Sequence, residues 1–292
     1  MRLFDLHCDT ITKLYTEKQQ LFDGNSQVNV KKTESFDEWN QVFAVFIPDT
    51  MRGKSALEYF FEVSRFYRQQ ISANSKALSV KSNHLLSVES GAVLAGNIDN
   101  IELLRQNDVK LLTLTWNGEN ELGFGVSNNK GLKVFGRECV KKLEQVGIAV
   151  DVSHLSDAGF YDVASESTKP FLASHSNSRK ICNHPRNLTD EQFKYIISVG
   201  GVVGINFHRP FVNENGDDYI SSLMLHIEHF LSLGGEKSLC IGSDFDGADI
   251  DKSLDSIDKI STLVAAMQSA NYSDDLIDDI MFNNARDFFE RL

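Results

Sequence analysis

Eight short apolar segments recur along the 292-residue chain, and polar residues follow each of them closely. The segments are rich in β-branched and other apolar residues, as strands are, and most of the intervals between them are long enough for a helix. Alternation of strand and helix predicts an α/β fold with a parallel sheet. Eight such units favour a closed (β/α)8 TIM-type barrel over an open sheet. The predicted strands are Leu3–Leu6, Val42–Ile47, Leu85–Val88, Lys110–Thr115, Ile148–Val152, Phe171–Ala173, Val202–Phe207 and Leu239–Gly242.

Nothing in the sequence marks a boundary between domains. The chain has four prolines, no low-complexity linker and no repeat of fixed period, so we predict one barrel domain over residues 1–292. Helical spacing of apolar residues predicts a helix over Ala56–Ile71, and a capping-box pattern at Thr189–Gln192 predicts the start of another. The irregular interval from Glu17 to Asn40 is the expected insertion or lid.

The charge and the cysteines restrict the partners and the compartment. Lys and Arg total 29 against 41 Asp and Glu, and the resulting net charge of −12 would repel a nucleic acid. The sequence has no apolar run of about 18 residues and no signal-peptide pattern. Its four cysteines lie far apart without a CxxC pair. We therefore expect a cytoplasmic protein with neither nucleic acid nor a membrane as a partner, and a homodimer is the candidate assembly.

Residues capable of metal binding or acid–base chemistry follow five of the eight predicted strands. In barrels of this type the active site forms at the C-terminal ends of the strands. His7 and Asp9 are two residues apart, so they would point to the same face, with Cys8 directed toward the surrounding helices. The full set comprises His7, Asp9, Glu89, His154, His175 and Asp244.

This set has nitrogen and oxygen donors and no sulfur, which is typical of a catalytic zinc site. Each histidine taken alone is better explained by a structural role, but together the buried charges would be unfavourable without cations. Six candidate ligands are too many for one ion, whereas two ions about 3.5–4 Å apart would use them all. Glu89, at a strand end of its own, is the natural bridge. The two-residue period leaves open whether Asp244 or Asp246 faces the site.

Arg186 lies in the loop after the sixth predicted strand. Its guanidinium could bind a substrate carboxylate through two hydrogen bonds. It could equally form a surface ion pair with Asp190 or Glu191. The sequence alone favours neither interpretation.

An ordered series of motifs over nearly the whole chain resembles the membrane dipeptidase (renal dipeptidase) family of zinc peptidases, within the metal-dependent amidohydrolase superfamily. The motifs are DLHCDT, SVESG, LTLTWNGEN, DVSHLSD, ASHSN, HPRNLTD, GSDFDG and FNNARDF. The resemblance implies two zinc ions per chain. It places His7 and Asp9 on one zinc, His154 and His175 on the other, and Glu89 between them.

The resemblance also assigns residues that geometry left open. It implies that Asp244, and not Asp246, is the catalytic acid and base, and that Arg186 receives the terminal carboxylate of the substrate. The chain departs from the family at Trp116, where well-studied members have a histidine that binds the substrate, so either Asn117 supplies the donor or the substrate preference differs. His208 stands where some relatives have a tyrosine, which makes it a candidate substrate-binding residue.

The expected function is hydrolysis of the amide bond of a small peptide. The resemblance implies a dipeptide substrate, including one with a C-terminal D-residue, attacked by a hydroxide that bridges two zinc ions. A related amidohydrolase acting on a lactam, a cyclic amide or an N-acyl amino acid is the first alternative. A metal-binding protein without catalytic activity is the second, and the complete ligand set argues against it.

Overall fold

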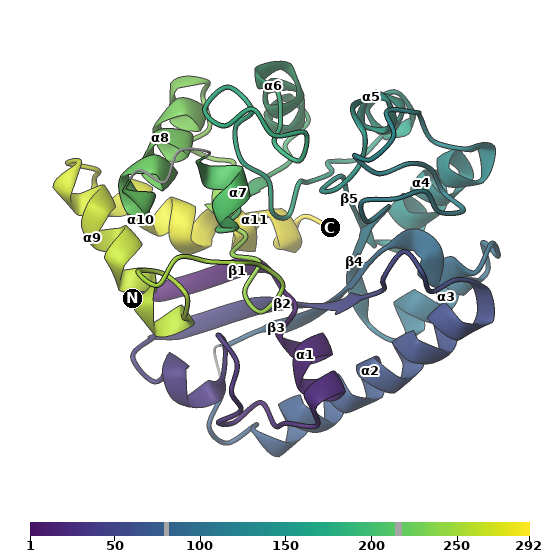
Figure 1. The fold of residues 1–292 in the computed structure, drawn as a ribbon, viewed down its shortest axis with the longest axis horizontal. Helices are drawn as coiled ribbons and strands as arrows, with labels where there is room; N and C mark the ends of the chain where they lie inside the picture. The colour runs from purple at the N-terminus through teal and green to yellow at the C-terminus, as the bar shows by residue number, and fades with distance from the viewer. Residues whose placement is uncertain (79–81, 214–217) are drawn as a thin grey trace.

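The computed structural model describes residues 1–78, 82–213 and 218–292, and in it parallel strands alternate with helices as predicted (Figure 1). Every pairing between neighbouring strands is parallel, in the order β5-β4-β3-β2-β1-β7-β6. The strands are β1 (Arg2–Cys8), β2 (Glu38–Phe46), β3 (His84–Glu89), β4 (Val109–Thr113), β5 (Ala149–Asp151), β6 (Val203–Ile205) and β7 (Leu239–Ile241).

The sixth predicted strand, Phe171–Ala173, is reduced to two single bridges. Leu172 pairs with β5 and Ala173 pairs with β6, so this short segment connects the two edges of the seven-stranded sheet and closes the barrel. The pairing is interrupted at Ser174, whose backbone N–H donates to the carboxylate of Asp151 at 2.9 Å, and the N–H of Ser176 then donates to the carbonyl of Gly204 in β6 at 2.8 Å.

The interior of the barrel is filled by one apolar layer to which all eight units contribute. Aromatic side chains from the C-terminal segment pack against this layer, with the rings of Phe4 and Phe289 stacked at 5.4 Å. The C-terminal helix therefore covers the end of the barrel opposite the site. The interior cluster comprises Phe4, Leu6, Val42, Leu85, Leu111, Ala149, Leu172, Val202, Cys240, Phe282, Ala285 and Phe288.

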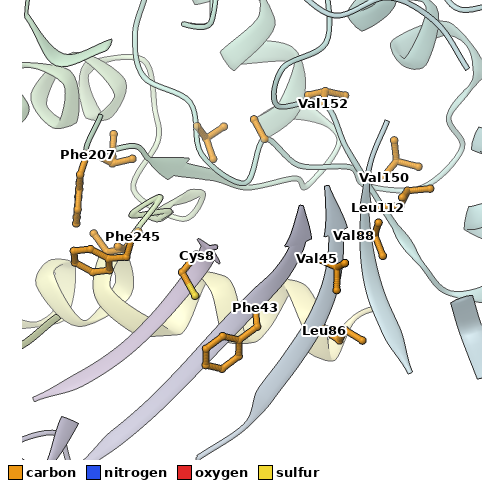
Figure 2. Close-up of a cluster of buried hydrophobic side chains, with 14 of the residues drawn as sticks. Cys8, Phe43, Val45, Leu86, Val88, Leu112, Val150, Val152, Phe207 and Phe245 are labelled. Atoms are coloured by element: carbon orange, nitrogen blue, oxygen red, sulfur yellow. The ribbon is translucent and has the colours of Figure 1, made fainter. Parts of the chain in front are cut away.

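The outward faces of the strands form a second, larger core with the helices (Figure 2). Cys8 belongs to this outer core, which confirms the prediction that its thiol faces the helices. Strict alternation after Phe4 and Leu6 would have turned Cys8 inward. The register between β1 and β2 shifts by one residue between Asp5 and Cys8, and this bulge reverses the alternation so that His7 points to the site.

The helices surround the barrel (Figure 1). The helix predicted over Ala56–Ile71 is α2, and the predicted capping box at Thr189 is present at the start of α6. The α-helices are α1 (Thr10–Glu17), α2 (Gly53–Ala73), α3 (Asn100–Gln106), α4 (Val134–Val146), α5 (Asp157–Glu166), α6 (Asp190–Ser198), α7 (Arg209–Val212), α8 (Tyr219–Ser232), α9 (Ser261–Ser269), α10 (Asp274–Asp278) and α11 (Asn284–Glu290). Shorter helical turns are η1 (Val30–Thr33), η2 (Gly91–Leu94), η3 (Ile257–Ile260) and η4 (Asp279–Asn283).

The interval between α1 and β2, predicted as an insertion or lid, packs on the barrel through buried Leu21, Val28 and Val30. The backbone N–H of Gln27 donates to Asp246 at 2.8 Å, and its carbonyl accepts from Ile257, so the interval is fastened to the loops after β7. Among the described helices, none combines the length and the apolar character needed to cross a bilayer.

Candidate metal centre and substrate pocket

All six predicted side chains converge at the C-terminal end of the barrel. His7 and Asp9 come from the end of β1 and Glu89 is the last residue of β3. The others follow β5, the Phe171–Ala173 segment and β7. Each of the six has a nitrogen or carboxylate oxygen within 3.8 Å of another member, and each is at most 9% exposed. The structure therefore assembles one buried cluster from residues that are up to 237 positions apart, His7 and Asp244.

Glu89 lies at the centre of this cluster. Its Oε2 is 3.7 Å from Nε2 of His7, while its Oε1 is 2.9 Å from Nε2 of His154 and 3.7 Å from Nε2 of His175. The two oxygens of this carboxylate thus face different histidines, an arrangement that suits a carboxylate shared by two metal ions.

A second group of donors surrounds His7 on the side of β7. Its Nε2 is 3.6 Å from Oδ2 of Asp9 and 3.8 Å from Oδ1 of Asp244. One possible ligand triad consists of His7, Glu89 and His175, and another of His7, Asp9 and Asp244. His7 belongs to both triads, so two closely spaced cations could share this set.

The hydrogen bonds of His154 and His175 fix which ring nitrogen can bind a metal. Burial lowers the pKa of both rings well below the ordinary range, so both are neutral. Nδ1 of His154 lies 2.8 Å from Oδ1 of Asn117, which can only accept. Nδ1 of His175 lies 2.7 Å from Oγ of Ser174, whose proton goes to Asp151. Both Nδ1 atoms therefore carry the proton, and the unprotonated Nε2 atoms face each other at 2.9 Å.

Zinc fits this donor set. Both ring nitrogens of His7 and Oδ1 of Asp9 are buried and lack a hydrogen-bond partner within the described part of the chain. Burial by itself lowers the pKa of His7, but Glu89, Asp9 and Asp244 outweigh it and raise the pKa to about 10. Burial also raises the pKa of Asp244 to about 6. The negative charge of these carboxylates stabilises a proton on His7. The same charge would stabilise a metal cation bound beside His7.

The backbone at the strand ends is shaped for this convergence. His154 and Asp244 adopt φ angles of 67° and 63°, in the left-handed region that non-glycine residues seldom occupy. Gly247 leaves room for Asp9, because a Cβ atom there would lie 2.0 Å from Oδ2 of Asp9. The backbone is strained at His154 and Asp244, and in this conformation their side chains point into the cluster.

The structure separates the roles of the two aspartates after β7. Asp246 is saturated by hydrogen bonds from Thr10 at 2.6 Å, Lys13 at 3.0 Å and the backbone of Gln27 at 2.8 Å, so it fastens loops together. Asp244 has one side-chain donor, Nδ2 of Asn206 at 3.0 Å to its Oδ2, and its Oδ1 faces His7. The carboxylate of Asp244 is therefore the one placed for chemistry.

A cavity of about 390 Å³ opens over the cluster. That volume lies at the small end of the range for small-molecule sites, roughly 300–1,000 Å³. The predicted Asn117 and His208 both line it. The lining comprises Asp9, Thr12, Lys13, Phe46, Glu89, Trp116, Asn117, His154, His208, Phe211, Asp244, Asp246 and Gly247.

Arg186 is buried next to this cavity without lining it, because it lines a separate, smaller cavity that shares His154 with the first. It is 4% exposed, which excludes the surface ion pair with Asp190 or Glu191. Its guanidinium lies 5.3 Å from the ring of Phe211 and donates to the carbonyl of His175 at 3.2 Å. Its buried Nε has no partner among the described residues, so this N–H is available to a ligand.

Two residues of the site were not predicted from the sequence, because neither is charged and one of them acts by holding another side chain. Phe46 ends β2 and lines the cavity, but a phenylalanine at a strand end resembles ordinary core. Asn206, which orients Asp244, follows β6 in the same position as the ligands follow their strands. Its place near the C-terminal end of a predicted strand could therefore have identified Asn206 as a site residue from the sequence.

The contact between Ser174 and His175 leads to a testable expectation about metal affinity. Replacing Ser174 with alanine should weaken zinc binding about 10- to 100-fold, because the ring of His175 loses the acceptor that holds the proton on Nδ1. Zinc affinity measured by competition with a chromogenic chelator tests this directly.

Ser153→Ala is the matched control for Ser174→Ala. The hydroxyl of Ser153 is also buried; it accepts from the backbone N–H of His175 at 3.1 Å and lies 3.4 Å from the hydroxyl of Ser174, but His175 Nδ1 bonds to Ser174 and not to Ser153. This variant should lose stability without a comparable loss of zinc affinity. Equal zinc affinities in the two variants would contradict the role assigned to Ser174.

Comparisons with known proteins agree with this geometry. The chain is 32% identical over 181 residues to an uncharacterised protein encoded in the pqqA 5′ region of Klebsiella pneumoniae, covering 58% of this chain and 67% of that protein. It is 27% identical over 223 residues to an uncharacterised dipeptidase of Schizosaccharomyces pombe, covering 72% of this chain and 54% of that protein, so it spans only about half of that relative.

Solved structures share the fold. A metallopeptidase from Rhodobacter sphaeroides, crystallised with a phosphinate mimic of the dipeptide L-Ala-D-Ala, superimposes with a TM-score of 0.88 at 23% identity, covering 100% of this chain and 99% of the other. The sequence model described as "Membrane dipeptidase (Peptidase family M19)" matches residues 1–290. With its barrel and its cluster of donors at the C-terminal rim, this chain belongs to the membrane dipeptidase family, peptidase family M19.

Proposed function

We propose that the protein is a dipeptidase that uses two zinc ions and hydrolyses short peptides, including those with a C-terminal D-residue. The observation that carries the proposal is the buried cluster around Glu89 beneath a cavity of about 390 Å³. The ligand of the Rhodobacter sphaeroides structure, a mimic of L-Ala-D-Ala, supports the D-residue. The expected cytoplasmic location and homodimer remain part of the proposal.

The chain supplies both the ligands and the proton transfer. His7 and Asp9 would hold one zinc, His154 and His175 the other, with Glu89 shared. Bound there, the two ions would polarise the peptide carbonyl and activate a bridging water as hydroxide for attack.

Asp244 would take the proton released in the attack and pass it to the leaving amine. Its Oδ2 is held by Asn206 at 3.0 Å, so Oδ1 keeps its direction toward the reacting centre. In the chain without ions burial raises the pKa of this carboxyl group, whereas zinc ions beside it would lower it. The position of Oδ1 therefore carries the assignment.

A substrate panel on zinc-loaded protein tests the proposed function. L,L- and L,D-dipeptides should be hydrolysed with larger kcat/KM than lactams, cyclic amides or N-acyl amino acids. Turnover confined to one of the latter classes would favour the related amidohydrolase. No turnover of any of them by protein that binds zinc would favour a non-catalytic role.

Arg186 is expected to bind the terminal carboxylate of the substrate. Arg186→Ala should lower kcat/KM for a dipeptide roughly 10- to 100-fold, mainly through KM, because a charged hydrogen bond is lost. The C-terminally amidated dipeptide supplies the control. Wild type should discriminate strongly between the acid and the amide, whereas the variant should treat them alike. Persistent discrimination by the variant would place the carboxylate elsewhere.

A further inference from the structure

Two aromatic side chains form one wall of the cavity. Phe46 and Trp116 both line it, and their rings meet edge to face with centroids 5.1 Å apart and planes at 71°. Phe46 ends β2 and Trp116 follows β4, so the wall is built from two different strand ends. Aromatic surface at a cavity offers a large apolar contact to a ligand side chain.

The wall is held rigidly in place. The carbonyl of Trp116 approaches Gly125 so closely that a Cβ atom there would lie 1.9 Å from it. The loop that carries Trp116 is further fixed by Asp49, which accepts from the N–H of Gly118 at 2.7 Å. The N–H of Phe46 donates to the hydroxyl of Thr12 at 3.0 Å. These contacts fix the backbone that carries the two rings, so less conformational freedom is lost when a ligand side chain packs against them.

The barrel order places Phe46 across the metal centre from the segment that leads to His175, whose carbonyl Arg186 contacts, while Trp116 follows β4, midway between the two. The Phe171–Ala173 segment, which leads to His175 and Arg186, lies between β5 and β6. Around the closed ring of eight, β2 is the unit diametrically opposite, and Phe46 is its last residue. A dipeptide whose carboxylate is held at Arg186 therefore extends its N-terminal residue toward Phe46.

The charged residues beside the wall form a neutral pair. Nζ of Lys13 lies 3.0 Å from Oδ1 of Asp246, and both residues line the cavity. The cation is thus compensated and offers little net attraction to an acidic side chain.

We propose that Phe46 and Trp116 form the subsite for the N-terminal side chain and select dipeptides in which that side chain is large and apolar. The inference rests on the proposed dipeptidase function and on the orientation set by Arg186. It names the substrate class that the sequence left open: an apolar residue such as phenylalanine or leucine at the N-terminal position.

Dipeptides that differ only in the first residue test the subsite. For wild type we expect kcat/KM for Phe-Ala and Leu-Ala to exceed that for Gly-Ala about tenfold or more, and Glu-Ala to be no better than Gly-Ala. Phe46→Ala and Trp116→His should each reduce the Phe-Ala to Gly-Ala ratio severalfold, and Phe46→Leu should preserve most of it.

Phe22→Ala is the control, since Phe22 is a partly exposed aromatic residue outside this cavity and its loss should leave the ratio unchanged. A wild-type ratio near one, a preference for Glu-Ala, or equal ratios in wild type, Phe46→Ala and Trp116→His would each overturn the subsite while leaving dipeptidase activity intact. Failure to hydrolyse any dipeptide would overturn the proposed function and the subsite together.

Discussion

Asp244→Asn is expected to lower kcat by about 100- to 10,000-fold, the contribution of a positioned acid and base. The amide has the same shape and can still accept from Asn206, but it cannot take the proton released in the attack. Zinc content should remain near that of wild type. Steady-state kinetics together with elemental analysis of the dialysed protein measure both quantities, and retention of most activity would refute the assignment.

Asp246→Asn is the matched control for Asp244→Asn. Both aspartates line the cavity and both have left-handed backbone angles. Asp246 is engaged by Thr10, Lys13 and Gln27, so its replacement should lower the melting temperature and cost far less activity than the Asp244 variant. If instead Asp246→Asn proved the more damaging to kcat, the two roles would have to be exchanged.

Glu89→Gln is expected to abolish activity by removing both metal ions. The two oxygens of Glu89 face histidines on opposite sides of the centre, so one amide nitrogen would replace a ligand to at least one ion and the shared negative charge would be lost. Zinc content should fall from two ions per chain to fewer than one after dialysis, as measured by elemental analysis. Two zinc ions retained per chain would contradict the bridging role.

The His154→Ala variant tests whether Glu89 binds both metal ions while His154 binds only one of them. His154 contacts Glu89 and His175 but is absent from the triads around His7, so this variant should lose one zinc and keep the other. Equal loss of zinc in the Glu89 and His154 variants would indicate a single cooperative site rather than two ions bridged by one carboxylate.

The fold could be predicted because its pattern is local and repeated eight times. Each apolar segment is short, most contain β-branched residues, and most are separated by intervals long enough for a helix, so the pattern can be recognised from the sequence of each segment alone. The Phe171–Ala173 segment shows the limit. Its composition predicts a strand, but the side chain of Asp151 accepts the next backbone N–H, so the pairing is interrupted there and the segment forms only single bridges.

The six side chains that converge at the rim could be predicted because polar, ionisable side chains at the ends of apolar strands are conspicuous. Asp244 and Asp246 could not be separated in this way, since the two-residue period applies to extended backbone and both residues leave it with positive φ. The pairing of Phe46 with Trp116 was hidden for a different reason. The two residues are 70 positions apart, and neither carries a charge that marks it as part of a site.

The sequence by itself determined the alternation of strands and helices, the rim at which chemistry would occur and the donor types gathered there, because these depend on local composition and spacing. Only the tertiary structure decided that a bulge in β1 turns His7 inward, that Asp244 rather than Asp246 is left available, and that Phe46 ends the strand opposite the Phe171–Ala173 segment. Such features depend on which groups from distant strands meet and satisfy one another's hydrogen bonds, and no single segment carries that information.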